Sequence, residues 1–128
     1  MNLTPVKYLI ALSMTFLTLL IYSCSSKVEA HFEISNSTNQ KIKYLSIQPD
    51  ENINNFITIE PNSKVSFKTD MTGIPKVDGS YRISFHSVDT PKGFNFGYYS
   101  NGYPAESITR IDIQPDTIII KPEYKKNY

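Results

Sequence analysis

Hydrophobic and polar residues alternate in short segments along most of the chain, and this two-residue period is typical of strands that bury one face. The pattern is clearest over residues 81–88, where Tyr81, Ile83 and Phe85 share one face. We predict strands at residues 31–35, 41–47, 55–60, 64–69, 81–88, 94–99, 108–113 and 117–121.

Turn-forming residues separate these segments. Asn, Asp, Ser, Pro and Gly gather at residues 36–40, 49–52, 89–93 and 100–104, and residues 70–79 are predicted to form a longer loop. No helical period follows residue 30. Short strands at this spacing predict an all-β fold, an antiparallel β-sandwich of seven or eight strands that is Ig-like, transthyretin-like or C2-like. A small closed barrel is the alternative.

Three strands carry further expectations. Over residues 41–47, Ile42 and Tyr44 have the opposite phase to Leu45 and Ile47, and a β-bulge between them would reconcile the two phases. The three isoleucines at 118–120 predict a strand that is covered on both faces. In residues 94–99, the alternation predicts that Phe94, Phe96 and Tyr98 point to the core.

The N-terminal region has a different pattern. Residues 8–22 are uncharged and mostly apolar, and Lys7 is the one charged side chain before them. This stretch is shorter than the roughly 20 residues that span a bilayer, and it fits the apolar region of a signal peptide. An uncleaved signal anchor and a plain secretory signal are the alternatives.

The apolar stretch ends in I-Y-S-C, residues 21–24, which resembles the lipobox of bacterial lipoproteins. In that resemblance Ile21 fills the aliphatic position, Tyr22 the variable position and Ser23 the small position. The resemblance implies cleavage before Cys24 and attachment of lipid to its thiol. Tyr22 is bulkier than the residues most often found there. The predicted organisation is then a signal peptide (1–23), a tether (24–30), a β-sandwich domain (31–122) and a polar tail (123–128).

The resemblance also carries an expected location. Size, lipobox and strand-rich composition are similar to those of small envelope lipoproteins of Bacteroidota, which implies no particular activity. Ser25, rather than Asp, follows the cysteine, and by similarity to enteric sorting this implies the outer membrane. Whether the domain faces the periplasm or the cell surface stays open.

Charge and cysteine content narrow the classes of function. The chain has 13 Lys plus Arg and 12 Asp plus Glu, and removal of Lys7 leaves 12 of each. With no basic excess, nucleic acid is not an expected partner. Cys24 is the single cysteine, so a lipidated chain has no thiol left for a disulfide or a metal. No cofactor is predicted.

Candidate catalytic residues are few. The two histidines, His31 and His86, are 55 residues apart in sequence, and no G-x-S-x-G motif accompanies them. A zinc site would need more converging ligands than they supply. The acidic pairs Asp50–Glu51 and Asp112/Asp116 lie in or beside predicted turns, and the sequon N-S-T at 36–38 is interpreted as a turn.

Tyrosines near residue 100 are the candidate binding surface. Tyr99 is predicted to point away from the core and Tyr103 lies in a turn, so both could contact a glycan or a protein. The sequence therefore predicts a non-enzymatic binding or accessory module, held at the membrane by lipid on Cys24, for an envelope protein or a glycan. The alternatives are an immunity or inhibitor lipoprotein against a secreted toxin, and a small hydrolase.

Overall fold

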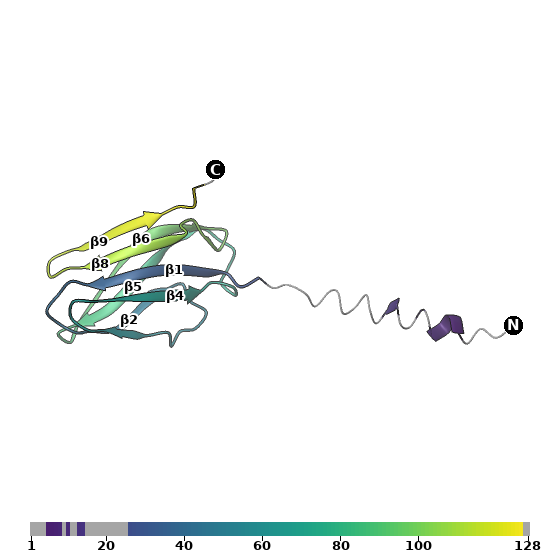
Figure 1. The fold of residues 1–128 in the computed structure, drawn as a ribbon, viewed down its shortest axis with the longest axis horizontal. Helices are drawn as coiled ribbons and strands as arrows, with labels where there is room; N and C mark the ends of the chain where they lie inside the picture. Colours follow the sequence, from purple (N-terminus) through teal and green to yellow (C-terminus); the bar gives the residue numbers. More distant parts are fainter. Residues whose placement is uncertain (1–4, 9, 11–12, 15–25, 127–128) are drawn as a thin grey trace.

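The computed structural model describes residues 5–8, 10, 13–14 and 26–126 and shows a sandwich of two sheets (Figure 1). The all-β sandwich prediction is confirmed, and two separate sheets take the place of the alternative closed barrel. The strands are β1 (Glu29–Asn36), β2 (Ile42–Gln48), β3 (Ile57–Ile59), β4 (Ser63–Asp70), β5 (Gly79–Ser87), β6 (Thr90–Ser100), β7 (Tyr103–Pro104), β8 (Ile108–Ile113) and β9 (Ile118–Glu123).

The two sheets have the strand orders β4-β1-β8-β9 and β3-β2-β5-β6-β7. All pairings are antiparallel except that of β1 with β8, which is parallel. β1 is therefore a central strand of its sheet, with Ile34 opposite both Val65 and Ile111. The described residues form nine strands, more than the predicted seven or eight, because the two-residue β7 follows the turn after β6.

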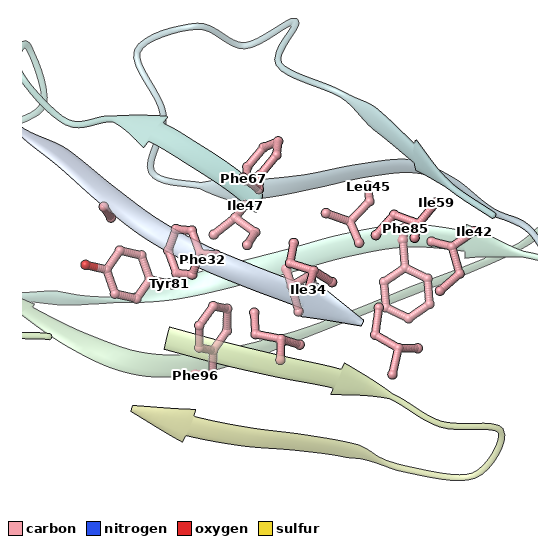
Figure 2. Close-up of a cluster of buried hydrophobic side chains, with 14 of the residues drawn as sticks. Phe32, Ile34, Ile42, Leu45, Ile47, Ile59, Phe67, Tyr81, Phe85 and Phe96 are labelled. Carbon is pink, nitrogen blue, oxygen red and sulfur yellow. The ribbon is translucent and has the colours of Figure 1, made fainter. Parts of the chain in front are cut away.

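Large side chains from both sheets meet in one core (Figure 2). Phe32 of β1 packs edge-on against Tyr81 of β5 and Phe96 of β6, with ring centroids 5.3 and 5.9 Å apart. Such edge-to-face pairs add to the hydrophobic stabilisation of a core. The core supplies the cohesion that a chain without a disulfide needs.

The folded domain begins before residue 31, its predicted first residue. β1 starts at Glu29, and Val28 and Ala30 are buried in the core. These residues therefore belong to the domain and not to the tether predicted for 24–30. At the other end, β9 continues to Glu123, the first residue of the predicted polar tail.

Two irregular positions set which side chains face the core. The predicted bulge in β2 is confirmed, because Tyr44 has φ of 53° and the register shifts between Lys43 and Ser46. Tyr44 points outward while Ile42, Leu45 and Ile47 are all buried. A second shift, unpredicted, occurs in β6 at Gly97, which has φ of 59°. A side chain is disfavoured at that backbone angle, and its Cβ would also approach the Tyr81 ring.

The turn between β5 and β6 differs from the prediction. Residues 89–93 were expected to form it, but Ser87 pairs directly with Thr90 and the turn is the dipeptide Val88-Asp89. Both residues have positive φ, the geometry of a type I′ hairpin. Asn101-Gly102 after β6 adopts the same positive φ angles, as their sequence predicts.

The sandwich has two distinct ends. The proximal end contains the start of β1, the ends of β4 and β9, and the loops over residues 49–56 and 71–78. The distal end contains the end of β1, the β5–β6 turn and the β8–β9 turn (Figure 1). In the part of the chain that is described, no helix combines the length and apolar character needed to cross a membrane.

Candidate binding groove

The distal end is fixed by Asn36, whose side chain is buried in the loop that joins the two sheets. Its Nδ2 lies within hydrogen-bonding distance of the carbonyl oxygens of Gln40, Ile59 and Glu60, at 2.8 to 3.2 Å. Its Oδ1 accepts from the backbone N–H and the hydroxyl of Thr38. The predicted turn at the N-S-T sequence is therefore present, and Asn36, at 1% exposed, is not accessible for glycosylation in the folded domain.

Beside this loop, a groove of about 810 Å³ opens between the two sheets. One wall is β6 and the other is β9, and the β1–β2 loop and the β8–β9 turn close the distal side. The lining residues are Thr38, Asn39, Gln40, Phe85, Ser87, Val88, Thr90, Lys92, Phe94, Ile113, Gln114, Pro115, Asp116, Thr117, Ile118 and Ile120.

The groove exists because neither wall has a further strand beside it. β9 is the last strand of its sheet. β6 pairs with β7 only at Tyr99 and Ser100, so its first nine residues have a neighbour on one side alone. Phe94, Ile118 and Ile120 face this gap and are only partly buried. The backbone donors and acceptors of both edges are accordingly free to pair with another extended chain.

This edge is where the prediction for the isoleucine run is wrong. The strand of Ile118, Ile119 and Ile120 was expected to be covered on both faces, but it lies at the sheet edge and Ile119 is exposed on the outer face. An apolar edge strand without a covering partner is unusual in a soluble domain, since it can pair with other chains. Ile118 and Ile120 of this run line the groove instead of packing beneath a covering strand.

Polar groups surround the groove without converging on one point. Lys92 and Asp116 lie on its rim, with Gln114 and Thr117 in the β8–β9 turn. Among the described residues, no group of three or more His, Cys, Asp or Glu is placed to hold a metal ion. The groove therefore combines an apolar floor, free strand edges and a rim with charges of both signs. These features are suited to binding a ligand.

The predicted tyrosine surface is altered by the bulge at Gly97. Tyr99 was expected to point outward, but it packs on the core against Tyr81, with ring centroids 5.5 Å apart. Tyr98, which was expected in the core, is exposed and donates a hydrogen bond to Asp78. Tyr103 is exposed as predicted, with the Lys76 ammonium 4.9 Å from its ring centroid.

The two histidines lie on opposite outer faces of the sandwich. His31 points outward from β1, 3.6 Å from a Glu29 oxygen, and His86 points outward from β5 against the Tyr44 ring. The two side chains therefore cannot meet at one substrate. This arrangement gives no support to the hydrolase alternative.

Three acids of the two pairs, Asp50, Glu51 and Asp112, have hydrogen-bond partners within the fold. Asp50 is buried and accepts hydrogen bonds from the backbone of Asn52 and Asp70 and from Asn55. Asp112 accepts from Ser37, and this hydrogen bond lowers the pKa of its carboxyl. These contacts join loops and strands, as expected for acids at turns.

Charged side chains on the outer face of β1 and its neighbours pair with one another. Lys64 and Arg110 both contact Glu33, and their hydrogen bonds lower the pKa of that carboxyl. Arg110 also pairs with Glu123. The face carries both signs in alternation, which is typical of a solvated surface and offers no single-sign patch.

The predicted lipid attachment residue, Cys24, and the lipobox residues Ile21, Tyr22 and Ser23 lie outside the described residues. Comparison of the chain with protein-family models, with curated proteins and with solved structures found no match.

Proposed function

We propose that this chain is a lipid-anchored, non-enzymatic binding module of a bacterial cell envelope, with the distal groove as its binding site. The observation that carries the proposal is the groove itself, an apolar channel flanked by the free edges of β6 and β9. The anchor would be lipid on Cys24, from the resemblance of residues 21–24 to a lipobox. The expected membrane is the outer membrane.

The groove favours a protein partner over a glycan. Ile118 and Ile120 offer aliphatic surface inside a channel, and the partly buried Phe94 ring packs edge-on against Phe85, with ring centroids 6.5 Å apart. An extended peptide can pair its backbone with a strand edge and place alternate side chains in the channel. The partner would therefore contribute an extended segment with apolar residues at every second position.

The arrangement of the ends agrees with such a role. The chain enters β1 at the proximal end (Figure 1), whereas the residues that line the groove lie toward the distal end. A domain tethered through its N-terminus would present the groove away from the membrane, where a partner can reach it.

Two neighbouring residues of β9 provide a matched test of the groove. We expect Ile120→Lys to abolish recovery of the partner when the lipidated chain is purified from native membranes, because the ammonium would lie in the apolar channel. Ile119→Lys, on the outer face of the same strand, should retain the partner. Partner recovery that is equal for the two folded variants would contradict the groove as the binding site.

The anchor has a separate test. Cys24→Ser should abolish incorporation of radiolabelled palmitate and leave the precursor uncleaved, since the thiol is the proposed acceptor. Ser26→Ala, two residues later, serves as the control and should be labelled normally. Labelling that persists in Cys24→Ser would overturn the lipoprotein assignment.

A further inference from the structure

The proximal end of the sandwich carries an unusual share of the exposed apolar side chains. Of the nine large hydrophobic residues that are exposed within residues 26–126, five lie in its loops, near the end of β6 or in β7. These five, which we call the proximal patch, are Ile53, Phe56, Val77, Tyr98 and Tyr103, exposed by 72, 51, 57, 48 and 50%.

The segments that carry the proximal patch are held together by hydrogen bonds. The Glu51 backbone donates to the Asp70 carbonyl, and its carboxylate accepts from Gly73, which fastens the 49–56 loop to the 71–78 loop. The Gly102 N–H donates to the Val77 carbonyl and fastens the β6–β7 turn to the same loop. The loops that carry the five side chains are therefore joined to one another.

Asp78 also joins the 71–78 loop to the end of β6 and to the β6–β7 turn. One of its oxygens accepts from Tyr98, and the other accepts from the Ser100 hydroxyl and the Asn101 backbone. These hydrogen bonds, that of Tyr98 first, lower the pKa of the carboxyl. The Asp78 oxygens are thus occupied by protein donors beside the exposed rings.

The same loops lie against the point where the chain enters the domain. Val28 donates to the Thr72 hydroxyl at 3.0 Å and accepts from the Met71 N–H at 2.8 Å. Cys24 precedes Val28 by four residues, a span of at most about 14 Å at 3.3–3.6 Å per residue. Lipid on Cys24 would hold these loops within that distance of the headgroups.

We propose that the proximal patch rests on the lipid headgroup region and orients the domain on the membrane. This inference depends on the proposed lipid anchor. Tyrosine rings with a hydroxyl suit the interface between headgroups and acyl chains, and Ile53 and Val77 add aliphatic surface. Lys76 lies beside Tyr103, where its ammonium can reach a lipid phosphate. The short tether gives the patch one partner, the bilayer, at a high effective concentration.

The absence of Trp from the sequence permits a clean test of this contact. The full, lipidated chain with Tyr103→Trp would be reconstituted in vesicles of phosphatidylethanolamine and phosphatidylglycerol that contain brominated phospholipid. We expect the indole to be quenched several-fold more strongly than that of Tyr44→Trp, and its emission to shift to shorter wavelength. Tyr44 is a matched control because it is exposed to 62% and lies on the outer face of β2, outside the proximal loops.

The outcomes separate this inference from the anchor. Equal, weak quenching of the two variants on vesicle-bound protein would overturn the lipid contact and leave the anchor in place. If the chain produced in its native host carried no lipid and did not associate with vesicles, both the anchor and the lipid contact would be overturned. An indole at position 103 that is shielded from aqueous iodide in native membranes but not in lipid vesicles would assign the patch to a protein and overturn the lipid contact.

Discussion

Replacement of Asn36 by Ala should lower the free energy of unfolding by about 3 kcal/mol or more, which is a large part of the stability of a domain of this size. The amide bridges the β1–β2 loop and the end of β3, and hence the two sheets. Its removal leaves the Ile59 carbonyl and the Thr38 N–H without these partners in a buried site. Urea unfolding at neutral pH, with unchanged m value, measures the effect.

Asn39→Ala is the matched control, since Asn39 lies in the same loop and is exposed, and it should change stability by less than about 0.5 kcal/mol. Asn36→Asp keeps the acceptor for Thr38 but replaces the donor with an oxygen that faces carbonyl groups. It should be as destabilised as the alanine variant. A loss below about 1 kcal/mol for both Asn36 variants would show that the loop holds the two sheets without this side chain.

The strands were predictable because their alternation is strong where one face is buried. Tyr81, Ile83 and Phe85 in β5 were predicted to share one face, and all three are buried in the core. Phe32 and Ile34 in β1 follow the same alternation and are also buried. Burial of one face and hydration of the other force a two-residue period on the sequence, and local pattern then reveals the strand.

The prediction of side-chain orientation was wrong where a single residue reverses the alternation of faces. Gly97 at positive φ inserts an extra position in β6, and every side chain beyond it changes face. Tyr99 therefore packs on the core and Tyr98 is exposed, the reverse of the prediction. The bulge at Tyr44 was predictable because the apolar residues on its two sides have opposite phases, whereas no such conflict marks Gly97.

The groove was not predictable because it depends on which strands are neighbours. The parallel pairing of β1 with β8 joins segments 77 residues apart, as the Glu33–Arg110 hydrogen bond illustrates, and it leaves β9 at the edge. Local sequence carries no record of strand order. The run of Ile118, Ile119 and Ile120 indicated a covered strand, and the groove is the place where the cover is missing.

Stability at alkaline pH should depend on Tyr81, whose phenol is buried between the sheets. Burial, and then the nearby charges of Glu106 and Tyr99, raise the pKa of Tyr81 well above its usual value near 10. The folded domain therefore retains a proton that the unfolded chain loses above pH 10. The contribution of Tyr81 is complete below that pH and should fall by about 1.4 kcal/mol per pH unit above it.

Tyr81→Phe removes this titration and keeps the ring that packs on Phe32 and Phe96. At neutral pH the variant should unfold at nearly the wild-type urea concentration, because within the described part of the chain the hydroxyl has one hydrogen-bond partner, the Met71 sulfur at 3.8 Å. Above pH 10 the variant should become the more stable protein, by about 2 kcal/mol at pH 11.5. Tyr44→Phe, which removes an exposed phenol, is the control. Stability curves of wild type and Tyr81→Phe that stay parallel from pH 8 to 11.5 would show that the buried phenol ionises without opening the core.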